Sequence, residues 1–255
     1  MSNTGMPRRA ASPIPTPPAA ADPASRTPAG RAYGGRSAED RSAERRARFV
    51  EAGIEVFGTA GLRGATVRGL CAAAGLTDRY FYESFDSVEA LLRAVHAALM
   101  ARLRDTLLRE AMVSEAWAGD TAAVAAQAAR AYALWFDFVR DPRVGRIVLV
   151  EVVGVSAALD AEVASAMDDF VQLTVAPLDV AMPGRAVPAS RRLLIGRALQ
   201  GAALHLARSW MASGYVAPRE DVVGACVLIA TGTLGALRDA AARAKAGTTG
   251  DALSA

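Results

Sequence analysis

Apolar residues recur at intervals of three and four along most of the chain, which places them on one face of an α-helix. From about 38 to 59 this face consists of Val50, Gly53, Ile54 and Phe57, and Gly61 follows as a stop signal. The same periodicity predicts further helices over about 86–109, 120–139, 156–182, 190–213 and 218–244. Abundant alanine and an aromatic content of only 6% favour helices over sheets. The pattern therefore predicts an all-α fold.

One interval, 143–153, fits two kinds of secondary structure. The run from Ile147 to Val150 is short and apolar, as in a buried strand. No other segment offers such a strand a pairing partner, so a short buried helix is the prediction.

Two short helices separated by a tight turn are predicted from Thr66 to Phe85. The hydroxyl of Thr66 suits an N-cap, and Thr77 is a second N-cap candidate. Gly75 suits the left-handed residue that ends a helix. The apolar face of the first helix consists of Val67, Leu70, Cys71 and Ala74. In the second helix, Phe81 and Phe85 are placed to face the core.

Helix, glycine turn and helix is the pattern of a helix-turn-helix, whose second helix enters the DNA major groove. The outer face of the second helix here carries Asp78, Arg79, Tyr80 and Tyr82. The next helix is predicted to start near Asp86 and Ser87, and Asp86 has capping-box spacing to Glu89.

This stretch resembles the N-terminal domain of TetR/AcrR-family transcriptional regulators. The resemblance covers roughly residues 45–95 and rests on Phe49, Ala52, Phe57, Gly61, Leu62, Ala65–Val67, Ala74–Thr77, Tyr82, Phe85, Ser87 and Glu89–Leu91. Two positions depart from the family. Val88 stands where the family usually has a phosphate-contacting lysine, and Ser84 where it often has a histidine.

The resemblance implies a three-helix DNA-binding domain at 38–87, a helical ligand-binding and dimerisation domain at 88–246, and a double-stranded DNA operator as partner. It implies that Arg68 reaches a base or a phosphate. The residues expected to face DNA are Thr66, Arg68, Thr77, Asp78, Arg79, Tyr80 and Tyr82.

The net charge of +3 is mild, but its distribution is informative. Arginines outnumber acidic residues over 41–83, which is the usual electrostatic footprint of DNA binding. These arginines are Arg41, Arg45, Arg46, Arg48, Arg63, Arg68 and Arg79. A solvated helix face is the alternative interpretation.

The last two predicted helices are rich in small residues that let helices approach closely. They are Gly196, Ala198, Gly201, Ala202 and Ala203 on the first, and Gly224, Ala225, Ala230, Gly232, Gly235 and Ala236 on the second. Two such faces predict a four-helix interface with a second copy, and packing within one chain is the alternative. In the family, the last two helices form the dimer interface.

A ligand cavity is expected around the predicted helix at 120–139, which concentrates Tyr132, Trp135, Phe136 and Phe138. Plain core packing is the alternative. In the family the corresponding region encloses an inducer cavity, and such pockets are apolar with a few polar anchors. The residues expected to bind a ligand are Tyr132, Trp135, Phe138, Glu151, Asp169 and His205.

An enzymatic function is not expected. The two histidines, His96 and His205, lie on separate helices, and no nucleophile-elbow, P-loop or zinc-protease motif occurs. No metal-ligand spacing is found, and no cofactor is implied. Cys71 and Cys226 have no paired spacing, which indicates a reduced, cytoplasmic protein.

No signal peptide is recognised, and the chargeless run 222–237 is shorter than the roughly 20 residues of a membrane span. Residues 1–37, rich in Pro, Ala and Arg, are predicted to be a disordered tail, and 247–255 a flexible one. The sequence therefore predicts a homodimeric, ligand-responsive DNA-binding repressor. The alternative is a helical small-molecule binding or interaction protein with weakened DNA binding, which Val88 and Ser84 would permit.

Overall fold

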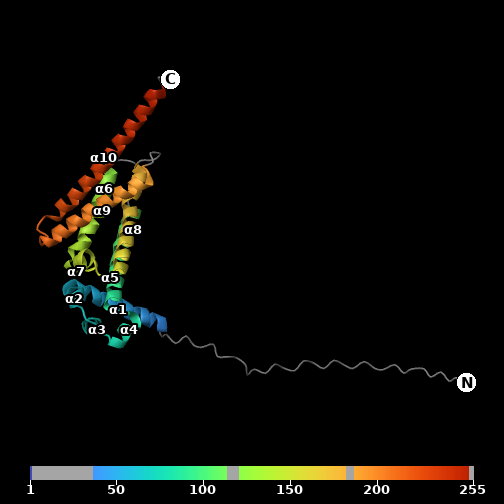
Figure 1. Ribbon diagram of the computed structural model, residues 1–255, viewed down its shortest axis with the longest axis vertical. Coiled ribbons are helices and arrows are strands. Elements are labelled where there is room, and N and C mark those ends of the chain that lie inside the picture. The colour runs from blue at the N-terminus through green and yellow to red at the C-terminus, as the bar shows by residue number, and fades with distance from the viewer. Residues whose placement is uncertain (2–36, 114–120, 182–186, 253–255) are drawn as a thin grey trace. The chain divides into compact units, whose positions relative to one another are not determined.

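The computed structural model describes residue 1 and residues 37–113, 121–181 and 187–252. Regular structure in these ranges is helical throughout (Figure 1). The order is α1 (Ala38–Thr59), α2 (Gly61–Gly64), α3 (Val67–Ala74), α4 (Asp78–Ser84), α5 (Val88–Val113), α6 (Thr121–Arg140), α7 (Pro142–Arg146), η1 (Ile147–Glu151), α8 (Ala157–Ala181), α9 (Ala189–Ala212) and α10 (Arg219–Ala252). The all-α prediction is confirmed. The predicted disordered tail lies outside the described residues except at its two ends.

The ambiguous interval 143–153 is helical, as predicted, but of an unusual kind. After the short helix α7, the chain forms a π-helical turn, η1, in which Ile147, Val148 and Leu149 are buried. Asp141 caps α7, because its carboxylate accepts a hydrogen bond from the Arg143 backbone N–H at 2.9 Å. The apolar run that resembled a strand is therefore a helix interior.

One predicted capping interaction and one predicted helix end were wrong. The capping box at Asp86 does not form, because α5 begins at Val88 and Ser87 Oγ accepts from the Ala90 backbone N–H at 3.0 Å. Glu89 instead accepts from the Ser156 hydroxyl, at 2.5 Å. At the other end of the chain, α10 continues to Ala252 rather than ending near Ala244.

The first four helices and the start of α5 share a core of large side chains. Phe49 of α1 lies against Phe81 of α4 in an edge-to-face arrangement, with 5.4 Å between ring centroids. Leu70 of α3 and Leu91 of α5 are fully buried in the same core. Gly53 lets α5 approach α1, since a Cβ there would lie 2.6 Å from a Val95 methyl group. This packing fixes α3 and α4 on α1.

The second half of the described chain is a bundle in which α10 packs along α6, and α8 along α9 (Figure 1). Gly196 permits the close contact of α9 with α8, because a Cβ there would lie 2.7 Å from methyl groups of Val171 and Val175. Trp210 of α9 packs edge-to-face on Phe136 of α6, at 5.7 Å. The helix α5 runs from the first core into this bundle.

The composition of α10 also meets the length and hydropathy expected of a membrane-crossing helix, from Arg219 to Arg243, with mean hydropathy 1.5. One such helix is a weak indication, because interior helices meet the same test. Here Val222, Cys226 and Leu234 are buried within the bundle. Only 22% of its apolar window is buried in the single chain, and one such helix does not indicate a membrane protein.

Candidate functional site

The turn between α3 and α4 has the geometry that the sequence predicted. Thr66 Oγ1 accepts from the Gly69 backbone N–H at 3.1 Å, which caps α3. Gly75 takes the left-handed conformation, with φ of 62°, and the following Leu76 N–H donates to the Cys71 carbonyl at 3.0 Å. Thr77 occupies the N-cap position of α4, but its hydroxyl makes no capping hydrogen bond. That hydroxyl is exposed at the start of the second helix.

The helix α4 presents a polar face to solvent. Phe81 is buried, whereas Thr77, Asp78 and Arg79 are exposed and Tyr82 is 62% exposed. Each of these four residues was among those expected to face DNA, as were the exposed Thr66 and Arg68 at the start of α3. A helix with an exposed N-terminal turn and a buried opposite face can enter a groove without disturbing the core.

Tyr80 has a different position from the other residues expected to face DNA. Its ring is half-buried beneath the Arg45 guanidinium, 4.6 Å from the ring centroid. Burial, and to a smaller extent a hydrogen bond with Asp78, together raise the pKa of the Cys71 thiol to about 11. Cys71 is therefore a protonated core residue that links α3 to the first turn of α4.

The arginines of this region fall into two groups. Arg46 and Arg48 bind backbone carbonyls within the motif, at Ser84 (2.6 Å) and Ala74 (2.7 Å) respectively. Arg79 pairs with Glu83 at 2.9 Å. Among the described residues, Arg63 and Arg68 are exposed and make no hydrogen bond or ion pair. The sequence analysis assigned all of these arginines to one DNA-binding surface. Arg46, Arg48 and Arg79 form contacts within the motif instead.

The C-terminal end of α1 and the turn into α2 are clamped by the short helix α7 and by η1. Glu151 Oε2 accepts from the Leu62 backbone N–H at 2.7 Å, and Arg146 Nε donates to Glu151 Oε1 at 2.8 Å. Arg146 Nη1 also donates to the Thr59 carbonyl at 2.6 Å. Gly61 makes room for this contact, since a Cβ would lie 2.5 Å from Arg146. The Glu151 side chain is 13% exposed. We call Glu151 and Arg146, with the Leu62 N–H and the Thr59 carbonyl that they bind, the Glu151 clamp.

A second connection lies beside the clamp. Arg143 of α7 donates to Glu55 of α1 at 2.8 Å and is held in place by Asp141. The guanidinium lowers the pKa of the Asp141 carboxyl below its usual value, chiefly through this hydrogen bond. Gly58 lies directly against Arg143, where a Cβ would be 2.4 Å from the Arg143 side chain. The short helix α7 therefore fits closely against α1.

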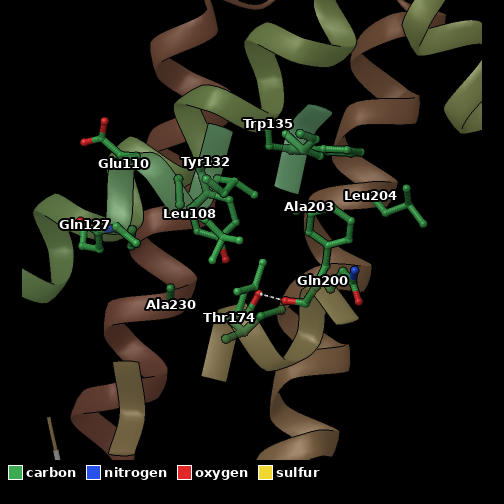
Figure 2. Close-up of a pocket in the computed structure, with 18 of the residues that line it drawn as sticks. Leu108, Glu110, Gln127, Tyr132, Trp135, Thr174, Gln200, Ala203, Leu204 and Ala230 are labelled. Carbon is green, nitrogen blue, oxygen red and sulfur yellow. Dashed lines mark hydrogen bonds between the residues drawn. The ribbon is translucent and has the colours of Figure 1, made fainter. Parts of the chain in front are cut away.

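A cavity of about 390 Å³ lies in the bundle (Figure 2). Side chains of α5, α6, α8, α9 and α10 line it, and most of them are apolar. Figure 2 shows Tyr132 and Trp135, from α6, on one side and Thr174 and Gln200, from α8 and α9, on the other. This volume lies within the range of small-molecule pockets, about 300–1,000 Å³.

The polar groups of the residues that line the cavity differ in whether they already form hydrogen bonds. Thr174 Oγ1 donates to the Phe170 carbonyl at 3.0 Å, and Gln200 Nε2 to the Met167 carbonyl at 3.2 Å. Trp135 Nε1, by contrast, is buried and has no hydrogen-bond partner in the described part of the chain. Burial raises the pKa of the Tyr132 phenol to about 12, so the phenol is neutral.

Of the six residues expected to bind a ligand, Tyr132 and Trp135 line the cavity. Phe138 packs on the hydrophobic core, and Glu151 belongs to the clamp. Asp169 and His205 are exposed on α8 and α9. The cavity is also lined by four polar residues that the sequence analysis did not predict, namely Glu110, Gln127, Thr174 and Gln200. Nothing in a single sequence distinguishes such residues from other polar positions on amphipathic helices.

The outer face of α9 and α10 carries small residues and exposed large apolar ones. Leu194 is 65% exposed, Leu228 73% and Ile229 48%. A Cβ added at Gly201, Gly224, Gly232 or Gly235 would meet no atom within 4 Å. The glycines that the sequence assigned to close helix contacts therefore border open space in the single chain, whereas Gly196 is the one packed against α8.

Comparison with known proteins agrees with this geometry. Residues 49–95 match the family described as bacterial regulatory proteins, tetR family. No curated protein matches the chain. A tetR-family transcriptional regulator from Streptomyces coelicolor is 23% identical, with a TM-score of 0.60 over 79% of this chain and 83% of that one.

Two further similar structures are fatty-acid regulators. The fatty acid degradation regulator FadR from Bacillus halodurans is 14% identical, with a TM-score of 0.62 over 74% of this chain and 95% of that one. FadR from Bacillus subtilis in complex with stearoyl-CoA is 13% identical, with a TM-score of 0.63 over 73% and 98%. Identities this low show a shared fold. The match at residues 49–95 and the helix-turn-helix geometry identify this stretch as a tetR-family DNA-binding domain, on a chain that shares the fold of tetR-family regulators.

Proposed function

We propose that this protein is a cytoplasmic, homodimeric transcriptional repressor that releases its DNA operator when a small molecule enters the cavity. The observation that carries the proposal is the exposed polar face of α4, held by a capped and glycine-terminated α3 in the same compact unit as the cavity. The residues proposed to face DNA are Thr66, Arg68, Thr77, Asp78, Arg79, Tyr80 and Tyr82.

The dimer is proposed to form through the outer face of α9 and α10. This face exposes Leu194, Leu228 and Ile229, and its open glycines would let a second copy approach closely. Two copies related by a two-fold axis would then present two copies of α4. Both must reach successive major grooves, about 34–36 Å apart, to bind one operator together.

Coupling between cavity and DNA is proposed to run through α6 and α7. Trp135 and Tyr132 of α6 line the cavity, and α6 leads within a few residues into α7. Arg143 and the Glu151 clamp hold α7 and η1 against α1. A ligand that moved α6 would therefore move α1 and the start of α5, and so change the separation of the two α4 helices. Such a ligand must bind the two states with different affinities.

The direct test is binding of the full chain to duplex DNA from the region flanking its own gene. Fluorescence anisotropy at several salt concentrations should give a log affinity that falls with log salt, by about 0.9 for each neutralised phosphate. A scrambled duplex serves as the control. Equal binding to both duplexes, or none at low salt, would contradict the proposal.

The alternative, a small-molecule binding protein with weakened DNA binding, is favoured by one observation. Val88, where the family usually has lysine, is half-buried and packs against the hydrophobic core, so position 88 offers no cation to a phosphate. The same anisotropy measurement separates the two functions, because this alternative predicts ligand binding without operator binding.

Replacement of Arg68 by alanine is expected to weaken operator binding. The side chain is exposed at the start of α3 and makes no hydrogen bond or ion pair with the described residues, so its loss should leave the fold intact. A bidentate base contact contributes about 1–3 kcal/mol of discrimination, which sets the size of the expected loss. Anisotropy measures it.

The matched control for this variant is Arg104→Ala. Arg104 is exposed on α5, beyond the stretch that resembles the DNA-binding domain. Its removal takes away the same charge without touching the motif. Equal effects of the two substitutions would show that Arg68 acts only through net charge.

A further inference from the structure

One face of α6 forms a wall of the cavity, and small side chains lie at the middle of that face. The lining residues of α6 recur at intervals of three and four positions, which places their side chains on the same side of the helix. They are Val124, Gln127, Ala128, Ala131, Tyr132 and Trp135. Ala128 and Ala131 are half-buried, so their methyl groups leave space that a larger side chain would fill.

The polar side chains around the cavity are already paired within the protein. The Thr174 hydroxyl and the Gln200 amide donate to backbone carbonyls of α8, and Gln127 Oε1 accepts from Arg130 at 2.9 Å. Burial raises the pKa of the Tyr132 phenol to about 12, which keeps it neutral. A group that already has its partner gains little from a second one. Contact with a ligand is therefore mainly apolar.

Charge in the lining is balanced by an ion pair. Glu110 is the one acidic residue among the described lining residues, which include no lysine, arginine or histidine. Its Oε1 lies 2.9 Å from Arg130 Nε, and Figure 2 shows its carboxylate turned away from the other labelled side chains. An anionic ligand would have to displace Glu110 to reach this guanidinium, and a cationic ligand would have to displace Arg130. Because burial of an unpaired charge is strongly unfavourable, ions of both signs are disfavoured.

We propose that the cavity binds an uncharged ligand through apolar contact and selects it by volume, with Ala128 and Ala131 setting the largest size that it accepts. The proposal rests on the proposed function, because it names the class of effector for the same cavity. That class is an aliphatic chain or ring system with at most a neutral polar group, such as a hydroxyl. A cavity of about 390 Å³ lies near the lower end of the range for ligand pockets, so the ligand is small.

Three probes with the same ten-carbon chain test the charge preference by isothermal titration calorimetry on the full chain without DNA. At neutral pH, 1-decanol is uncharged, decanoate is an anion and decylammonium is a cation. 1-Decanol should bind at least about tenfold more tightly than either ion. If either ion binds as tightly as 1-decanol, the ion pair of Glu110 and Arg130 does not exclude charge and the proposal fails.

A series of alcohols tests the selection by volume. From 1-hexanol to 1-decanol, affinity should rise about fourfold for each methylene that the cavity buries. Ala131→Leu fills part of the cavity and should lower the ratio of 1-decanol to 1-hexanol affinity by at least about tenfold. Ala128→Leu, about one turn earlier on the same face of α6, should lower it too. Each ratio compares two ligands on one protein, so a general loss of stability does not alter it.

The matched control is Ala126→Leu, because Ala126 is exposed on α6 and does not line the cavity. This variant should leave the ratio unchanged. An unchanged ratio in both Ala131→Leu and Ala128→Leu would overturn the selection by volume, and binding of none of the alcohols would overturn the ligand class. Operator affinity is measured separately. Alcohol binding that follows the expected ratios but leaves DNA binding unaffected would support this inference and contradict the proposed effector function.

Discussion

Gly232→Leu is expected to turn the proposed dimer into a monomer and to abolish most operator binding. In the single chain, a Cβ at Gly232 meets no atom within 4 Å, so a side chain can leave the backbone there without a clash inside one protomer. In a close-packed interface the same side chain overpacks the contact, typically by about 1–3 kcal/mol. A two-fold axis repeats that cost, which gives roughly 2–6 kcal/mol against dimerisation. A monomer then binds only one half-site.

Sedimentation velocity and operator anisotropy on the same sample measure the two effects. The control is Ala161→Leu, which adds an equally large side chain at an exposed position of α8, away from the proposed interface. It should remain dimeric and bind DNA normally. If Gly232→Leu behaves as this control does, α10 is not in the interface. If the unmodified protein sediments as a monomer at micromolar concentration, the groove-spacing mechanism fails altogether.

Glu151→Ala is expected to destabilise the protein and to separate ligand binding from DNA release. The substitution leaves the Leu62 backbone N–H and the Arg146 guanidinium without this carboxylate, in a place where the Glu151 side chain is only 13% exposed. Leaving a buried donor unsatisfied costs about 1–3 kcal/mol, and the free energy of unfolding should fall by that amount. Urea denaturation measures the fall. Ligand affinity should persist, while its effect on operator affinity should shrink.

The control for this variant is Asp168→Ala. Asp168 forms a bidentate pair with Arg197, but both side chains are 51% exposed, so its loss should cost at most about 1 kcal/mol. Glu151→Gln adds a graded comparison, because its amide oxygen can still accept from Leu62. Should Glu151→Ala be no more destabilising than Asp168→Ala and keep full ligand response, the clamp would have no part in coupling.

Local features of the helix-turn-helix could be predicted because they depend on neighbouring residues alone. The Thr66 cap and the left-handed Gly75 follow from side-chain reach and from the absence of a Cβ, and both are found. Asp86 and Glu89 have the spacing of a capping box, but the box does not form. The Ser87 hydroxyl caps α5 instead, and Glu89 accepts a hydrogen bond from Ser156 of a distant segment. Competition from such a distant partner is not visible in local sequence.

The cavity and the clamp depend on distant contacts and could be predicted only in part. Tyr132 and Trp135 were found because aromatic residues concentrate on one helix, but Thr174 and Gln200 come from other helices that meet them only in the folded bundle. Glu151 was expected to be one of the polar anchors of an apolar ligand pocket. Its partner, the Leu62 N–H, is 89 positions away, and no periodicity could show that pairing.

The π-helical turn η1 determines which way Glu151 points. Successive residues of an α-helix are rotated by about 100°, so one residue fewer between Ile147 and Val150 would turn the following side chain away from α2. The contact between the two halves of the protein thus depends on chain length in one turn as much as on residue identity. Loss of a single codon there would break this contact even though Glu151 itself is retained.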